Sequence, residues 1–176
     1  MIMPRGQQLL LPVNPWFIWG SLIAALAFNM MQNMGLWGRA AWLPDMLAVV
    51  LLFWTIHQPQ RIGVGAAFSL GLSMDVHQSA LLGQHALSYT ALSFLAIGIH
   101  RRLLWFSVPS QAAQVLPLFV AAHALALTVR LIAGAEFAGW SVLLAPLIDA
   151  LFWPAVSVLL LWPQRRAPDP DANRPL

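Results

Sequence analysis

The stretch LGLSMDVHQSALLGQHALSY, residues 70–89, places one carboxylate and two imidazoles in the middle of a very apolar chain. The acid is Asp75, and the histidines are His77 and His85. Burying a charge away from water is costly unless the charge is paired and hydrogen-bonded. Asp75 is therefore a catalyst, a ligand or a structural contact between helices, and the surrounding sequence has to distinguish these roles.

The composition indicates a membrane protein. Of the 176 residues, 60% are hydrophobic and only 9% are charged, whereas a soluble domain usually carries about 25% charged residues. The mean hydropathy of +0.72 points the same way. We therefore expect one helical bundle with no room for a second sizeable domain. The chain has no cysteine, which excludes disulfides and thiolate metal sites.

Several apolar segments approach the length of about 20 residues that a transmembrane helix needs. They cover residues about 16–37, 43–56, 62–82, 86–104, 112–133 and 140–162. The predicted fold is all-α: a polytopic membrane protein with six transmembrane helices in one bundle, spanning residues 16–163. Residues 1–15 form a cytoplasmic N-terminal segment, and residues 164–176 form a proline-rich, charged tail predicted to be disordered. The second segment is short, and a re-entrant piece there would leave five spans.

The distribution of arginine favours six spans. All nine basic residues are arginines scattered over predicted helix ends, so the pI near 11.1 does not indicate nucleic-acid binding. With both termini cytoplasmic, most arginines lie on the inner side, as the positive-inside rule expects. Five spans would place two arginine pairs on the side opposite Arg5. The inner set is Arg5, Arg61, Arg101, Arg102, Arg165, Arg166 and Arg174, and the outer set is Arg39 and Arg130.

The tryptophans support these boundaries. Indole rings favour the headgroup region, where one edge of the ring is apolar and the N–H is hydrated. Most of the nine tryptophans, Trp54 among them, fall at or near predicted span ends, and Trp153 lies in the middle of a span.

Polar side chains gather in the outer half of the predicted bundle, on five different spans. A lipid-facing Asp at a helix centre costs roughly 2.5–3.5 kcal/mol, so these acids should face inward and pair. Arg130 is the natural partner for Asp75 or Asp149. We predict a network that locks the bundle, and a polar cavity for a substrate or a docking pocket is the open alternative. The predicted network comprises Asn29, Asn33, Asp45, Asp75, Arg130 and Asp149.

Small residues recur at four-residue intervals before Asp75, in the sequence RIGVGAAFSLGLSMD, residues 61–75. Such spacing lets two helices approach closely, and close packing drives association in lipid. We predict that Gly65, Ser69 and Gly71 contact a helix of a partner protein. Packing within the chain is the alternative, and Gly20 with Ala24 forms a weaker instance of the same pattern.

The sequence offers no motif for catalysis or for a metal. The spacing of Asp75, His77 and His85 matches no zinc helix motif such as H-E-x-x-H. Several serines lie near these histidines, but no serine elbow and no phosphate loop accompanies them. We therefore predict no catalytic, cofactor-binding or metal-binding residue, and we expect each histidine to make a structural hydrogen bond.

One long stretch of the chain resembles a known family. It runs LPDMLAVVLLFWTIHQPQRIGVGAAFSLGLSMDVHQSALLGQHALSYTALSFLAIGIHRRL, residues 43–103. The Pro44–Asp45 pair, the Pro59-x-Arg61 turn, the small-residue run to GLSMD, the LLGQHALSY segment and the paired arginines resemble the rod shape-determining protein MreD family. The likeness extends from about residue 15 to 163. Asp45 and Asp75 are the polar positions that match.

The resemblance carries expectations beyond those drawn from the residues. It implies a non-catalytic scaffold of the elongasome in the bacterial inner membrane, which supports lateral peptidoglycan synthesis and rod cell shape. It implies an MreC-like single-span partner and indirect links to MreB, RodA and a penicillin-binding protein, besides contact with membrane lipid. It also implies a fold similar to the substrate-binding components of energy-coupling-factor transporters.

Two other functions stay open. A small-molecule substrate-binding component of a transporter would use the outer polar residues as a pocket. An intramembrane enzyme would need a serine within hydrogen-bond reach of a histidine.

Overall fold

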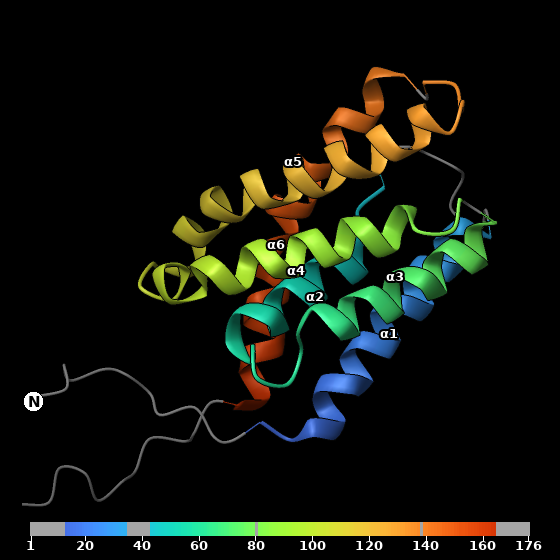
Figure 1. Ribbon diagram of the computed structural model, residues 1–176. Coiled ribbons are helices and arrows are strands. Elements are labelled where there is room, and N and C mark those ends of the chain that lie inside the picture. Colours follow the sequence, from blue (N-terminus) through green and yellow to red (C-terminus); the bar gives the residue numbers. More distant parts are fainter. Residues whose placement is uncertain (1–12, 35–42, 80, 138, 165–176) are drawn as a thin grey trace, which may run out of the picture.

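Helices form all the regular structure in the part of the chain that the structure describes. The computed structural model (Figure 1) describes residues 13–34, 43–79, 81–137 and 139–164. The expected all-α class is confirmed, with no strand in these ranges. Arg5, Arg39 and the tail after Gln164 lie outside the described residues. The elements are α1 (Pro15–Asn33), α2 (Met46–His57), α3 (Val64–Gln78), α4 (Gln84–Leu103), α5 (Val108–Ile132), η1 (Trp140–Leu144), α6 (Ala145–Leu161) and η2 (Trp162–Gln164).

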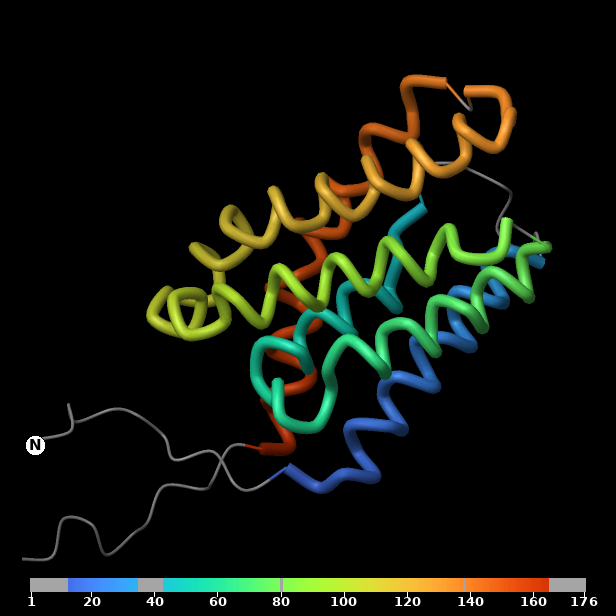
Figure 2. Tube along the Cα trace, in the orientation of Figure 1, coloured from blue at the N-terminus to red at the C-terminus, as the bar shows by residue number. Residues whose placement is uncertain are grey.

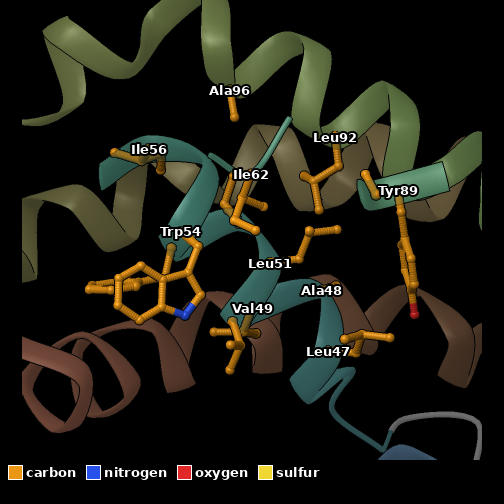
Figure 3. Packing of buried hydrophobic residues seen from close by; sticks show 14 of the residues in the cluster. Leu47, Ala48, Val49, Leu51, Trp54, Ile56, Ile62, Tyr89, Leu92 and Ala96 are labelled. Carbon is orange, nitrogen blue, oxygen red and sulfur yellow. The ribbon is translucent and has the colours of Figure 1, made fainter. Parts of the chain in front are cut away.

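Helix α2 is the centre of the molecule. Its side chains from Leu47 to Ile56 are all buried, because α1, α4 and α6 pack around it. A helix that is apolar on every side needs such complete burial. Figure 3 shows this core, with Tyr89 and Leu92 of α4 beside α2. The second apolar segment, which is short, thus forms a central helix that its neighbours enclose completely.

Trp54 departs from the position that its sequence context predicts. It is fully buried at the centre of the core, and its indole Nε1 donates to Ser21 Oγ of α1 at 2.7 Å. Trp153 is also buried, and its Nε1 donates to Gln111 Oε1 at 3.3 Å. Both rings fill internal space and satisfy their N–H groups internally. Trp54 lies near the end of α2, as predicted, but protein encloses its indole where a hydrated N–H was expected.

Helices α3 and α4 form a close antiparallel pair. A Cβ atom added at Gly71 would lie 2.5 Å from the Cα of Ala86, so only a glycine permits this approach. The prediction that Gly71 contacts a partner's helix is therefore wrong, because α4 of the same chain occupies that side. Gly65 has open space around its Cα, and Ser69 is exposed.

Two helical stretches are long and apolar enough to cross a membrane among the described residues. They are Val108–Ile132 and Trp140–Gln164, and Met46–His57 is a shorter apolar helix. Large apolar side chains are exposed along several helices, including Phe94, Leu151 and Leu159. An apolar surface this extensive is typical of a face that contacts lipid or another protein.

The helix ends divide the bundle into two ends. The C-terminal ends of α1, α3 and α5 lie together with the N-terminal ends of α2, α4 and α6 (Figures 1 and 2). We call this the polar end, because the buried acids lie at or near it. The turn between α2 and α3 and the turn between α4 and α5 lie at the opposite end (Figure 1).

Candidate functional site

Asp45 connects three helices at the polar end. It is the N-cap residue of α2, and its Oδ1 accepts a hydrogen bond from the backbone N–H of Ala48 at 3.0 Å. Aspartate is among the preferred residues at this position, because it satisfies an N–H group that the first helical turn leaves unpaired. The same oxygen accepts from Asn29 Nδ2 of α1 at 2.6 Å, and Oδ2 accepts from the Tyr89 hydroxyl of α4 at 2.7 Å. One carboxylate therefore ties α1, α2 and α4.

Asp149 extends this contact to α5 and α6. Its side chain is fully buried, and Oδ1 accepts the backbone N–H of Asp45 at 2.7 Å. Its Oδ2 lies 3.4 Å from His123 Nε2 of α5. The other ring nitrogen of His123 lies 3.0 Å from the Phe119 carbonyl oxygen, which can only accept. The Asp149–His123 contact is therefore attractive when Nε2 or the carboxyl group carries a proton.

Asp75 caps the first turn of α4. Its carboxylate accepts the backbone N–H groups of Gly83 and His85 at 2.8 Å each and of Ala86 at 3.3 Å. The Nδ1 of His85 lies 2.8 Å from Oδ1. Gly83 has a φ of +106°, which a glycine adopts without strain, and the chain can therefore turn back to present these N–H groups. A carboxylate at a helix N-terminus also interacts favourably with the helix dipole.

The partner predicted for these acids is wrong. Within the described ranges, no carboxylate oxygen lies within 4 Å of the Arg130 guanidinium. Backbone N–H groups and the His85 ring satisfy Asp75, while Asp45 and His123 contact Asp149. The physical reason is that a helix start supplies several unpaired N–H donors, and sequence-based counting of charges omits them.

A cavity of about 690 Å³ opens at the polar end. Asn29, Asn33, Asp45 and Arg130 of the predicted network line it. Asp75 and Asp149 do not line it, but each contacts a histidine, His85 or His123 respectively, that does. The structure thus places four predicted residues around one space and the other two directly behind its wall.

Sequence-based reasoning expected structural contacts for His85 and His123 but did not assign them to Asp75 and Asp149, and it missed the hydrogen bond from Tyr89 to Asp45. Tyr89 is the only tyrosine in the chain and lies four residues after His85, on the same helix face. That spacing was an available signal. His123 carried none, since its contact with Asp149 depends on how α5 and α6 pack.

Several other polar side chains near the histidines contact backbone carbonyl oxygens, within one helix or between two helices. Ser73 Oγ donates to the Ser69 carbonyl and Ser88 Oγ to the Ala122 carbonyl, at 3.0 and 2.9 Å. His77 Nε2 lies 3.1 Å from the Met30 carbonyl oxygen. Over the described parts of the chain, no three His, Cys, Asp or Glu side chains are placed to hold a metal ion.

These features define a class of protein: an all-helical chain with an apolar exterior, whose buried carboxylates join its helices. Residues 12–163 match the family described as rod shape-determining protein MreD, and the chain belongs to that family. The rod shape-determining protein MreD of Haemophilus influenzae is 27% identical over 117 residues, which cover 66% of this chain and 72% of that protein. No solved structure matches the chain significantly.

Membership of the family gives the protein its general role. It is a membrane protein of the system that determines rod cell shape, in which MreC and MreB-associated machinery also work. The family is a shape-determining structural family.

Proposed function

We propose that this protein is a non-catalytic scaffold of the bacterial inner membrane that binds an MreC-like single-span protein. Through that partner it supports lateral peptidoglycan synthesis by the elongasome, with indirect links to MreB, RodA and a penicillin-binding protein. The observation that carries the proposal is the use of three acids at the polar end, of which Asp75 and Asp149 are buried and Asp45 is partly buried. Asp45, Asp75 and Asp149 each accept backbone N–H groups and contact another helix, so their chemistry serves to hold the bundle.

The proposed topology has six spans and two cytoplasmic termini. Helix α2 packs against α1, α4 and α6, and α4 packs against α3 and α5, so all six helices are joined in one bundle with the two candidate membrane spans. The asymmetric distribution of arginine sets the orientation. In this orientation the polar end faces the outer side of the membrane.

The proposed partner contact is the exposed face of α3 around Gly65 and Ser69. Gly65 has no heavy atom within 4 Å of an added Cβ, and Phe68 beside it is 45% exposed. The hydroxyl of Ser69 donates to the Gly65 carbonyl at 3.0 Å, so this polar group is already satisfied within the helix. The backbone of another helix can approach such a face closely without leaving this hydroxyl group unpaired.

Co-purification tests the proposal. The full chain with Gly65→Leu is expected to recover several-fold less of the MreC-like protein from membranes than the wild type, since the bulk blocks close approach. Gly98→Leu on α4 is the matched control, because Gly98 is also helical and has equally open surroundings. We expect Gly98→Leu to recover the partner normally.

Three outcomes are informative. Equal recovery with both variants would contradict the α3 contact. Failure of the wild type to recover the partner at all would contradict the scaffold function. Saturable uptake of a small solute across the membrane would favour the alternative function, a substrate-binding component of a transporter, for which the cavity at the polar end is the supporting observation.

A further inference from the structure

The cavity at the polar end has the size of a small-ligand site. Its volume of about 690 Å³ falls within the range of roughly 300–1,000 Å³ that is common for such sites. Its walls come from α1, α3, α4, α5 and the start of α6. The acids that fix these elements to one another lie in or directly behind the wall, so the space is built by the fold itself.

Neutral hydrogen-bonding groups dominate this wall. Four carboxamides, those of Gln32, Asn33, Gln78 and Gln84, line the cavity together with Asn29. Asn29 is 4% exposed and uses its Nδ2 for Asp45, while its Oδ1 has no hydrogen-bond partner within the described residues. A buried acceptor without a partner is unfavourable, because it has lost its hydrogen bond to water and gained none in return. The wall therefore offers several amide groups and at least one unsatisfied acceptor.

Among the described residues of the wall, Arg130 carries the one positive charge that no carboxylate pairs with. Arg130 lies in the last turn of α5 and lines the cavity, and none of the carboxylates described lies within 4 Å of its guanidinium. Of the described residues in the wall, Asp45 alone carries a carboxylate, and both of its oxygens already accept hydrogen bonds. An anion entering the cavity would thus meet a free cation and a carboxylate whose charge is already partly compensated.

We propose that this cavity binds a phosphate ester that carries free hydroxyl groups. The phosphate would pair with Arg130, since a planar guanidinium matches phosphate oxygens with two parallel hydrogen bonds. The hydroxyls would hydrogen-bond to the carboxamides, which donate and accept. The cavity lies at the helix ends, the depth at which lipid headgroups are found. The headgroup of phosphatidylglycerol and free glycerol phosphate share this chemistry. The inference goes beyond the scaffold function and does not depend on a partner protein.

The test measures binding to the purified full chain in a neutral detergent by calorimetry. The probes are short-chain phosphatidylglycerol and glycerol 3-phosphate, and short-chain phosphatidylcholine is the control, because its headgroup has a phosphate but no hydroxyl. We expect saturable binding of at least one hydroxyl-bearing probe and weaker binding of phosphatidylcholine. Binding of phosphatidylglycerol alone identifies a lipid headgroup as the source. Binding of glycerol 3-phosphate as well identifies a soluble phosphate ester.

Matched variants decide whether the cavity is the site. Arg130→Gln should lower the affinity about tenfold or more, since a charge-assisted hydrogen bond is lost. Arg101→Gln removes an exposed cation near the end of α4, away from the polar end, and should leave the affinity unchanged. Asn33→Leu places bulk in the cavity wall at an exposed residue whose side chain makes no hydrogen bond to another described residue. It should also weaken binding, and it decides the matter if Arg130→Gln does not fold.

Either of two results would overturn the inference. One is the absence of saturable binding of both hydroxyl-bearing probes by the wild type. The other is an affinity that Arg130→Gln and Asn33→Leu change no more than Arg101→Gln does. Partner recovery in the co-purification experiment is independent of both results, so failure of the ligand site and failure of the scaffold function are distinguishable.

Discussion

At the scale of single residues, the acids at the polar end act as acceptors for helix starts. Asp75 accepts three backbone N–H groups of the α4 start, and Asp45 caps α2 while it accepts Asn29 and Tyr89. Because Asp75 and the start of α4 pack against each other, the N–H groups there would otherwise stay unpaired. The carboxylates thus replace the solvent that a soluble protein would offer its helix ends.

Removal of the Asp75 carboxylate should destabilise the protein. In Asp75→Ala the N–H groups of Gly83, His85 and Ala86 lose their acceptor, and we expect a loss of about 2 kcal/mol or more in the free energy of unfolding. Asp75→Asn keeps one acceptor oxygen and should lose roughly half as much. Thermal unfolding in detergent measures both. Wild-type stability in both variants would show that Asp75 does not hold α3 to α4.

At the scale of elements, close backbone contact is specific to one point between α3 and α4. Gly71 lies against the backbone of Ala86, whereas Gly65, six residues earlier on the same helix, has open surroundings. Small residues at helical spacing therefore have two different uses within one helix. One is internal packing, and the other is the exposed face that we propose for the partner.

Gly71→Ala should destabilise the helix pair. The added Cβ would lie 2.5 Å from the Ala86 Cα, and because the clash is with backbone, α3 and α4 have to separate. We expect a loss of about 1–3 kcal/mol, the usual cost of overpacking. Gly98→Ala is the control, since its surroundings are open and alanine favours a helix by about 0.5–1 kcal/mol over glycine. Equal stability of the two variants in detergent would contradict the close approach.

At the scale of the whole molecule, α2 is the helix around which the others pack, and the acids link the helix ends at the polar end. Helix α2 is enclosed by α1, α4 and α6, and the Asp45–Asp149 contact links it to the start of α6. The exterior is apolar on several helices, so the molecule is arranged with its polar groups inside and at its ends. This arrangement suits a bilayer, where helices satisfy their own backbone groups.

Reporter fusions test the proposed topology of the whole molecule. A reporter enzyme that works only in the cytoplasm should be active when it is fused after Gln164. A reporter enzyme that works only in the periplasm should be active when it is inserted between α3 and α4, at residues 79–83. The reason is that seven of the nine arginines then lie on the inner side. A periplasmic signal after Gln164 would contradict six spans.

The sequence by itself determined the class of the protein. Its apolar content required a membrane, the four-residue spacing of small residues predicted close helix contact, and the Pro44–Asp45 pair at the start of an apolar run marked a helix start. These features are local, because helix formation and capping depend on residues within a few positions of one another. Each predicted apolar segment consequently corresponds to one α-helix, most closely the segment at about 86–104 to α4.

Only the tertiary structure decided which groups meet. The sequence favoured Arg130 as the partner of an acid. In the folded chain, Asp75 instead accepts backbone N–H groups at the start of α4, and Asp149 contacts Asp45 and His123. It also turned Trp54 from a boundary residue into a core residue and assigned Gly71 to internal packing. The physical reason is that these contacts join residues on different helices. Their pairing is set by how whole helices pack, which no local spacing specifies.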